Sequence, residues 1–318
     1  MFKTKRILIP TDFSKNAVQT YAYAKAFAQN NNTKIDLVYI IQSLSYLEIS
    51  REVAHYPLDV KEITKRMEQQ FIDELQQELE SNFDEDLRGQ VYIKHSVKAV
   101  KGILEQLEEE QYDLVIMGSR GRGESDLMRG GTTQQLVRSS PVPVLSFKKD
   151  FNPEKGNVLV PTDGSLVSLK ALLVALSLVQ EANFQVYSVV DLDFDAVGYA
   201  PPAPDMYRTL LNERKKDIIE NIRELMAYSD QFDYKVGTAM NAVLIEDENG
   251  REIQIEIIIE NRASAYRAIL DYAEENADMV VMTTRGRSGF KRIVIGSVTE
   301  KVVRHLDIPI CTIKPERQ

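Results

Sequence analysis

The sequence is poor in the residues that usually supply disulfides and metal sites. Its 318 residues include a single cysteine, Cys311, so no disulfide can form within the chain and the cytosol is the expected compartment. Cys311 lies in an apolar run, and we expect it to be a packed strand thiol. None of the three histidines, His55, His95 and His305, has a partner at metal-ligand spacing. With no nucleophile elbow and no serine–histidine–aspartate order either, we expect no catalytic residues and no metal centre.

Long hydrophobic runs and an excess of positive charge are also missing. No apolar run reaches the length of a membrane span, and residues 1–6 lead into an expected strand without the apolar segment of a signal peptide. The net charge of −9 and the pI near 5.1 argue against a partner that is nucleic acid or anionic membrane. With 43% hydrophobic and 27% charged residues, the composition is that of an ordinary globular protein.

The two halves of the chain repeat each other. Ile7-Leu8-Ile9-Pro10-Thr11-Asp12 returns as Val158-Leu159-Val160-Pro161-Thr162-Asp163, an offset of 151 residues. Asp113 and Asp278, like Gly131 and Gly296, are 165 residues apart, so the second copy is about 14 residues longer between these landmarks. We predict two domains, residues 1–149 and 150–318, joined near a charged segment with proline and glycine at 148–156.

Short β-branched runs alternate with helical patterns in both halves. This alternation predicts an α/β fold with a doubly wound parallel sheet in each half. In the first half Ser14 is the expected N-cap of the first helix. The expected first-half strands are 7–9, 35–41, 90–97, 113–117 and 142–147, and the later helices 60–79, 103–110 and 133–139. The expected second-half strands are 158–160 and 184–190, and the helices 168–180 and 205–228.

One segment of the second half has no counterpart in the first. Residues 242–245 and 253–259 are apolar runs that flank a turn with Asn249-Gly250, a strong hairpin signal. We predict an added antiparallel hairpin over 239–259 that lengthens one edge of the sheet. Its role is not written in the sequence: the added edge could bind a partner, but a simple surface elaboration is the plainer interpretation.

A glycine-rich stretch is the main candidate for a binding site. Residues 117–133 follow an expected strand, precede an expected helix and read MGSRGRGESDLMRGGTT. A glycine turn before a helix N-terminus presents backbone N–H groups and the positive end of the helix dipole to one point, where a phosphate fits. We expect glycine there because a Cβ would hold a ligand away from the backbone and because such turns often need a positive φ. The stretch is neither a Walker A loop nor a dinucleotide fingerprint.

The glycine spacing resembles the ATP-binding signature of the universal stress protein family. Gly118, Gly121 and Gly131-Thr132 carry the resemblance, and an imperfect copy follows in the second half. Together with the repeated strand starts, the resemblance covers nearly the whole chain twice. It implies two five-stranded sheets in the order 3-2-1-4-5, like those of adenine nucleotide alpha hydrolases. It also implies an intrachain pseudo-dimer in which strands 142–147 and 308–313 meet, with a homodimer left open.

The resemblance also implies which residues bind the nucleotide. Asp12 and Ile40 would contact the base, and Gly118 and Gly121 would lie near the ribose and phosphates. Without a ligand, Asp12 would still stabilise the N-terminus of its helix. The remaining first-half positions are Pro10, Thr11, Met117, Gly131, Thr132 and Thr133. The second-half positions are Asp163, Val189, Thr283, Gly286, Gly296, Ser297 and Val298.

The first half is the favoured site. Thr283 replaces the first glycine of the second copy, and a threonine forced to a positive φ would cost about 1–3 kcal/mol. The second loop is more basic, but exposed charges contribute only about 0.2–1 kcal/mol each. We therefore expect the second site to be weaker or empty.

Three functions fit this pattern. The first is a nucleotide-binding regulatory or protective module for stress, with ATP, or else AMP or ADP, as ligand and magnesium possible with ATP. The second is a slow magnesium-dependent ATP hydrolase that uses the same loop. The third is a protein-interaction module that binds no nucleotide. Co-purified nucleotide would separate the first from the third.

Overall fold

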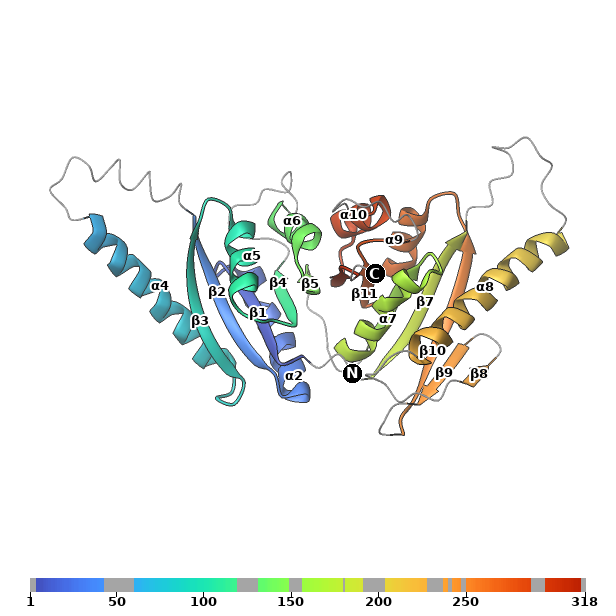
Figure 1. The fold of residues 1–318 in the computed structure, drawn as a ribbon, viewed down its shortest axis with the longest axis horizontal. Helices are drawn as coiled ribbons and strands as arrows, with labels where there is room; N and C mark the ends of the chain where they lie inside the picture. Colours follow the sequence, from blue (N-terminus) through green and yellow to red (C-terminus); the bar gives the residue numbers. More distant parts are fainter. Residues whose placement is uncertain are drawn as a thin grey trace. The chain divides into compact units, whose positions relative to one another are not determined.

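The computed structural model describes residues 4–42, 60–118, 131–148, 156–179, 181–190, 204–227, 237–239, 242–246, 250–286 and 295–315. The chain forms two compact units. The N-terminal unit comprises Lys3–Asp150, and the C-terminal unit comprises Phe151–Gln318 together with Met1–Phe2. Strands and helices alternate within each unit (Figure 1).

The strands of the N-terminal unit lie in the order of a doubly wound sheet. β1 (Arg6–Thr11) is central, with β2 (Lys34–Gln42) and then β3 (Arg88–Ser96) on one side. β4 (Leu114–Gly118) and β5 (Val144–Phe147) follow on the other side. All the pairings among these strands are parallel. The predicted order 3-2-1-4-5 is therefore confirmed here, and the carboxyl ends of the strands lie at one edge.

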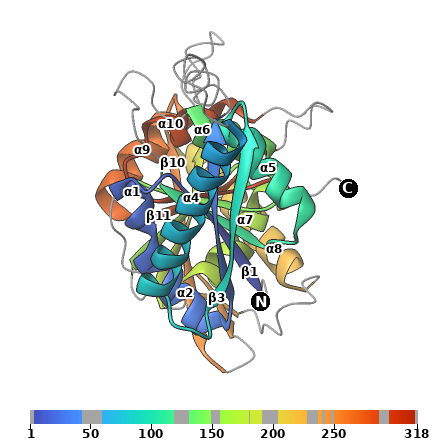
Figure 2. The same cartoon turned by 90° about the vertical axis from the view of Figure 1, so that its left-hand side faces the viewer.

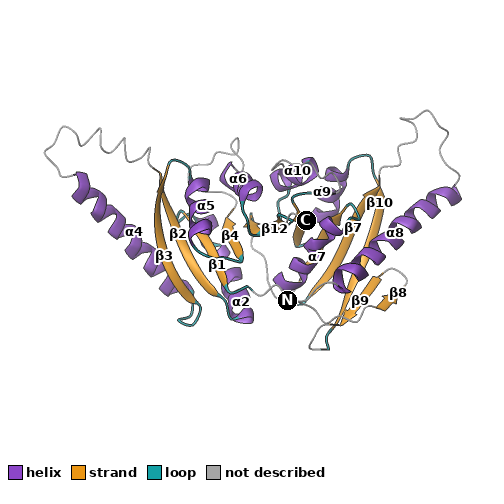
Figure 3. Cartoon of the chain, viewed as in Figure 1, coloured by secondary structure: helices purple, strands orange, loops and turns teal. Residues whose placement is uncertain are grey.

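Helices cover both faces of this sheet. α1 (Lys15–Val18), α2 (Thr20–Asn31) and α4 (Val60–Asn82) pack against one face. α5 (Ala99–Glu109) and α6 (Gly131–Ser139) contact each other and the other face. Figure 3 shows these helices on either side of the strands, and Figure 2 shows α4 across the near face. The helices therefore meet the expectation of a doubly wound fold.

The first helix begins at the predicted cap and is interrupted early. The Ser14 hydroxyl oxygen accepts a hydrogen bond from the backbone N–H of Ala17 at 3.2 Å. The Thr20 hydroxyl then donates to the Ala17 carbonyl at 2.7 Å, at the break between α1 and α2. The apolar face of this segment is buried and comprises Ala17, Tyr21, Ala24 and Ala28.

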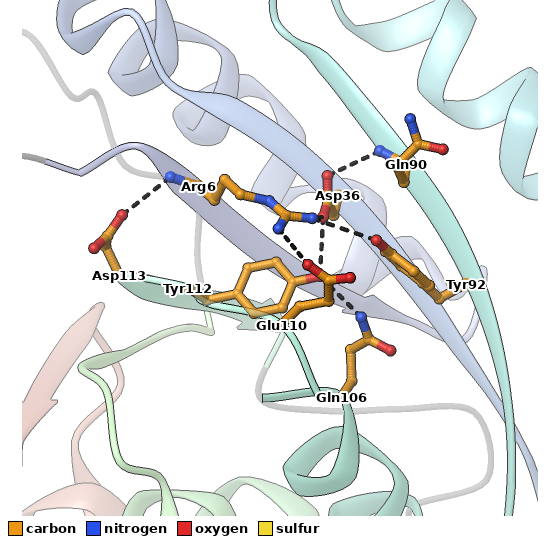
Figure 4. Close-up of polar contacts among 8 residues, drawn as sticks. All are labelled: Arg6, Asp36, Gln90, Tyr92, Gln106, Glu110, Tyr112 and Asp113. Carbon is orange, nitrogen blue, oxygen red and sulfur yellow. Dashed lines mark hydrogen bonds and ion pairs between the residues drawn. The ribbon is translucent and has the colours of Figure 1, made fainter. Parts of the chain in front are cut away.

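A buried ion pair ties together the amino ends of β1 and β2 (Figure 4). The Asp36 carboxylate is 1% exposed and lies 2.5 Å from the Arg6 guanidinium. Arg6 also donates to Glu110 at 2.7 Å, and the Tyr112 hydroxyl donates to Asp36 at 2.9 Å. Burial alone would lower the pKa of Arg6, but its hydrogen bonds to Glu110 and Asp36 outweigh burial and raise it. The arginine therefore stays charged.

The backbone around this ion pair is arranged to receive the carboxylate. The backbone N–H of Gln90 donates to Asp36 Oδ1 at 2.8 Å. A Cβ added at Gly89 would collide with the same oxygen, so β3 can approach Asp36 only with glycine at that position. Gln106 donates to the Tyr112 hydroxyl at 3.0 Å, which completes the cluster (Figure 4).

The C-terminal unit repeats the five parallel strands. β6 (Gly156–Thr162) is central, with β7 (Ala182–Val190) and β10 (Glu252–Asn261) on one side. β11 (Met279–Thr283) and β12 (Ile310–Ile313) lie on the other side. These strands pair in parallel in the order β10-β7-β6-β11-β12, again 3-2-1-4-5.

The predicted hairpin is present, but its assignment as an addition is wrong in one respect. β9 (Ala242–Glu246) pairs antiparallel with β10, and Gly250 has the φ of +78° that suits a turn. However, β10 is also the third parallel strand of the unit, paired along β7. The added strands are β9 and the short β8 (Gly237–Ala239), which pair with each other beyond β10. The alternating apolar pattern of 253–259 suits either role, so the sequence did not separate them.

The helices of the C-terminal unit also lie in two layers. α7 (Leu166–Leu178) and α8 (Pro204–Ala227) contact each other and pack on the sheet. α9 (Ala265–Asn276) and α10 (Ser297–His305) form the second contacting pair. Among the described helices none is long and apolar enough to cross a membrane. The single cysteine, Cys311, is fully buried in β12, as expected, and burial raises the pKa of its thiol.

Candidate functional site: a cavity at the carboxyl ends of β6 and β11

The turn that follows β6 is shaped by the side chain of Asp163. Its Oδ1 accepts hydrogen bonds from the backbone N–H of Ser165 at 3.0 Å and from the Ser165 hydroxyl at 2.6 Å. The Ser168 hydroxyl donates to the same oxygen at 2.8 Å. Ser165 is also the N-cap of α7, since its Oγ accepts from the backbone N–H of Ser168 at 3.2 Å. The carboxylate is therefore held from three directions at the start of a helix.

A cavity of about 210 Å³ opens at this turn. Parallel strands end at the same edge of a sheet, which is where ligands of open α/β sheets bind. All the residues predicted for the second half line it: Asp163, Val189, Thr283, Gly286, Gly296, Ser297 and Val298. The volume is below the roughly 300–1,000 Å³ of pockets that enclose a whole drug-sized ligand. The cavity can therefore enclose a base or a sugar more readily than a complete triphosphate.

The walls of the cavity include residues that the sequence analysis missed. Ala265 and Ile269, on α9, supply apolar surface, and Tyr187 of β7 supplies a ring. The Tyr187 hydroxyl donates to Glu260 at 2.9 Å, and its ring stacks on Tyr272 with centroids 4.6 Å apart. Burial, reinforced by the bond to Glu260, raises the pKa of Tyr187, so the wall there is neutral. The helical spacing of Ala265 and Ile269 was a signal for a buried face but not for a site.

The start of α10 faces the same cavity. Gly296 is its N-cap and provides no side-chain hydrogen bond, and Ser297 and Val298 form the first turn. The N–H groups of a first helical turn have no acceptor within the helix, and the dipole there favours negative charge. Arg285, which also lines the cavity, adds a cationic side chain. This side of the cavity can therefore receive an anionic group.

The reasons expected for the glycines are only partly right. Among the described residues, the glycines with positive φ are Gly164 and Gly250. A positive φ is therefore not the reason for glycine at the predicted positions Gly118, Gly131, Gly286 and Gly296. An added Cβ at Gly118 would lie 2.5 Å from the backbone oxygen of Asn16, whereas at Gly286 it would collide with the Asp163 carboxylate. Glycine is needed at these two positions because other parts of the chain pack against them.

Thr283 does not meet the condition under which it would weaken the second site. It is absent from the described residues with positive φ, so no left-handed strain arises there. The side chain is 4% exposed, and its hydroxyl donates to the Arg285 carbonyl at 2.5 Å. The threonine therefore helps to hold the loop. The ranking of the two sites stays a prediction.

The N-terminal unit brings most of its predicted residues to the corresponding edge. Pro10 and Thr11 end β1 and Asp12 follows them, and Met117 and Gly118 end the neighbouring β4. Asp12 Oδ1 accepts from the backbone N–H of Ser14, the N-cap of α1, at 3.0 Å, a turn contact that needs no ligand. Ile40 lies in β2, and Gly131, Thr132 and Thr133 begin α6. Gly121 lies outside the described residues.

The two described histidines lie near the carboxyl end of β3 and at the end of α10. His95 Nε2 is 2.6 Å from Glu68 Oε1, and His305 is in the last turn of α10, where a cation suits the helix dipole. His55 lies outside the described residues. Within the described parts of the chain, no group of three or more histidine, cysteine, aspartate or glutamate side chains could hold a metal.

Comparison with known proteins decides the family. The model of the family described as "Universal stress protein family" matches residues 3–148 and, a second time, residues 155–314. The chain belongs to the universal stress protein family. The two matches make it a tandem member of that family, which agrees with the internal repeat.

Relatives of this universal stress protein include chains of one and of two repeats. It is 24% identical over 328 aligned positions to the universal stress protein Slr1230 of Synechocystis, covering 98% of this chain and all of that one. It is 27% identical over 163 positions to the universal stress protein MJ0531 of Methanocaldococcus jannaschii, covering 51% of this chain and 83% of the relative.

The fold is similar to that of a solved tandem-length universal stress protein. The crystal structure of a universal stress protein from Archaeoglobus fulgidus aligns over 99% of this chain and 97% of its own, with a TM-score of 0.61 and 20% identity. At this identity the likeness supports the fold alone.

Proposed function

We propose that this tandem universal stress protein binds an adenine nucleotide at the carboxyl ends of its sheet strands, as a ligand-dependent stress-response module. The observation that carries the proposal is the cavity of the C-terminal unit. Residues from four separate segments, the ends of β6, β7 and β11 and the start of α10, converge on it. Those segments are the ones that the sequence pattern marks for nucleotide contact.

The two sides of the cavity suit the two ends of a nucleotide. The Asp163 carboxylate is an acceptor and can receive a hydrogen bond from an amino or hydroxyl group of a nucleoside. Apolar surface from Val189, Ile269 and Met282 suits the face of a base. The first turn of α10 and Arg285 suit a phosphate. We place the base and sugar inside and the outer phosphates towards solvent, because the cavity is small.

The proposal extends to the N-terminal unit. Asp12, Met117, Gly118 and Gly131 occupy the matching strand ends and helix start there. Among the described residues, no atom lies within 4 Å of a Cβ built at Gly131, which suits a residue that faces a phosphate. Magnesium would enter with the phosphates of ATP, since the described residues offer no metal cluster and Mg²⁺ commonly binds through one or two carboxylates and substrate phosphates.

Calorimetric titration with ATP tests the proposal. Asp163→Ala should lower the affinity of one site by about tenfold, because it removes a charged hydrogen-bond acceptor. Gly286→Ala should weaken the same site, because its Cβ would displace the Asp163 carboxylate. Asp307→Ala is the matched control, since Asp307 is exposed and lies outside the cavity lining.

Four outcomes of this titration, together with nucleotide and phosphate-release assays, separate the functions considered above. ATP binding that falls with Asp163→Ala and not with Asp307→Ala supports a site in the C-terminal unit. Binding that falls only with Asp12→Ala or Gly131→Val places the nucleotide in the N-terminal unit. Absence of ATP, ADP and AMP from the purified protein, with no heat of binding at millimolar ATP, would refute nucleotide binding. Magnesium-dependent phosphate release lost in Gly131→Val would favour the hydrolase.

A further inference from the structure

Two side chains of α8 reach across to the turn that carries Asp163. The Arg214 guanidinium donates to the backbone carbonyl of Asp163, and its Nε lies 3.4 Å from the Ser188 hydroxyl oxygen. About two turns further along α8, the Asn221 amide donates to the Gly164 carbonyl at 2.7 Å. Consecutive carbonyls of the turn are therefore held by a helix that follows them by about fifty residues.

The turn is built to admit Arg214. Gly164 has a φ of +79°, and a Cβ added there would lie 2.8 Å from Arg214 Nη1. The glycine therefore permits both the left-handed backbone and the approach of the guanidinium. The corresponding position of the N-terminal unit is Phe13, whose ring lies 5.2 Å from Tyr39 and 6.4 Å from Phe71 between centroids. Among the described residues, an arginine therefore donates to this turn in the C-terminal unit, whereas rings pack beside it in the N-terminal unit.

The position of the Asp163 carboxylate depends on two independent anchors. Ser165 and Ser168, at the start of α7, hold Oδ1 of the side chain. Arg214 holds the carbonyl of the same residue from the other side. Ser188 is completely buried, so the contact of Arg214 with it directs the guanidinium towards the turn. Releasing the carbonyl would free the backbone from which the carboxylate enters the cavity.

We propose that Arg214 is a positioning residue for the cavity of the C-terminal unit. It fixes the Asp163–Gly164 turn and so directs the Asp163 carboxylate at a ligand group that donates a hydrogen bond, such as the amino or hydroxyl group of a nucleoside. The inference rests on the proposed function for the identity of the ligand, but the fixing of the turn does not depend on any ligand.

ATP titration of the full chain tests the effect on binding. Arg214→Met keeps a side chain of similar length without the donors and should weaken the site that Asp163→Ala identifies by about tenfold. Arg214→Lys should recover part of the loss, because an ammonium can still donate to one carbonyl. Lys216→Met is the matched control, since Lys216 is an exposed cation on the same helix.

A double-mutant cycle separates positioning from general stability. If Arg214 acts through Asp163, Arg214→Met should cause no further loss of affinity in the Asp163→Ala background. A tenfold loss that persists in that background would show that Arg214 acts on the stability of the unit alone, and would overturn the inference. Melting temperatures of all variants, measured in parallel, identify any variant that fails to fold.

Hydrogen exchange provides a readout without ligand. The backbone N–H groups of Ser165 and Ser168 donate within the turn, so their exchange should be about tenfold faster in Arg214→Met and unchanged in Lys216→Met. Faster exchange in a protein that binds no ATP would sustain the role of Arg214 in the turn and refute the proposed function. Unchanged exchange together with unchanged ATP affinity would overturn the inference while leaving the proposed function intact.

Discussion

The two units share one backbone turn and stabilise it with opposite chemistry. The second residue after β1 and after β6 has positive φ in both, 58° at Phe13 and +79° at Gly164. In the N-terminal unit Phe13 packs against two aromatic rings, whereas in the C-terminal unit an arginine from α8 binds the turn. Tyr39 is paired with Thr11 in the N-terminal unit, as Ser188 is paired with Thr162 in the C-terminal unit. An aromatic cluster in one unit therefore occupies the position of the arginine cluster in the other. The fold fixes the turn and leaves its support free to vary.

The two units also differ at the amino ends of their strands, and here it is the N-terminal unit that has the arginine-centred cluster. Asp36 and Gln185 occupy the same register position, opposite Leu8 and Leu159. The N-terminal unit places a buried ion pair there, whereas the neutral Gln185 makes hydrogen bonds, a long one of 3.4 Å to Glu256 and one to Tyr272. Each unit therefore carries an arginine-centred cluster at one end of its sheet, and the two clusters are at opposite ends.

The largest predicted effect is the loss of the buried carboxylate. Asp36→Ala leaves the Arg6 guanidinium without its buried partner and removes the acceptor for Tyr112 and Gln90, so it should destabilise the N-terminal unit by about 3 kcal/mol. Gln185→Ala should cost about 1 kcal/mol in the C-terminal unit. Urea unfolding, followed by circular dichroism, measures both. Asp84→Ala is the control, because its pair with Lys25 is exposed and its loss should be smaller. Equal effects of all three would contradict the comparison.

Exchanging the residues that end the fourth strands should give the next largest effect. Gly118→Thr introduces a Cβ at 2.5 Å from the Asn16 backbone oxygen, where only a shift of α1 can make room, and should cost about 2 kcal/mol. Thr283→Gly in the C-terminal unit removes one hydrogen bond and should cost about 1 kcal/mol. Thermal unfolding of the two variants measures the difference. A Gly118→Thr protein as stable as the wild type would show that α1 moves freely.

Alkaline pH should act on the N-terminal unit through Tyr21. Burial raises the pKa of Tyr21 to about 12, so the unfolded chain loses this proton near pH 10 and the folded chain does not. The contribution of Tyr21 to stability is complete below pH 10 and is lost as the pH rises to about 12. Tyr21→Phe should therefore reduce the loss of stability between pH 10 and 11 by about 1 kcal/mol. Unfolding in urea at each pH measures it.

The control for that experiment is Tyr266→Phe. The hydrogen bond from Arg267 lowers the pKa of Tyr266, so replacing this tyrosine should not reduce the loss of stability at alkaline pH. If both phenylalanine variants behaved alike, the loss would come from somewhere other than the buried tyrosine.

The smallest predicted effect concerns the aromatic turn. Phe13→Gly relieves a left-handed backbone worth about 1–2 kcal/mol, but it gives up ring burial and ring pairs worth about 2–4 kcal/mol. The net result should be a loss of about 1 kcal/mol in the N-terminal unit. Differential scanning calorimetry measures it. A more stable Phe13→Gly protein would mean that the rings do not support the turn.

The part of the site that follows from the sequence is the part that lies next to strand ends. Asp163 follows an apolar run, and Gly296-Ser297 precedes a helical pattern. These positions in the chain sufficed to predict that both lie at the carboxyl-end edge of the sheet, where they line the cavity. Arg214 and Asn221 could not be found in this way, because α8 is polar over much of its length and neither residue stands out there. Likewise, the partner of Gly118 is a backbone atom of α1, and no pattern of side chains reveals a contact between backbones.

Cys311 offers a direct gauge of how often the C-terminal unit opens. Its thiol is fully buried in β12, and it is the only one in the chain. A water-soluble disulfide reagent can reach it only when β12 separates from its surroundings, and burial also disfavours the reactive thiolate in the closed state. The rate at which the thiol of the native protein reacts with such a reagent, followed by the colour of the released product, therefore reports the opening of this unit alone. No label or mutation is needed.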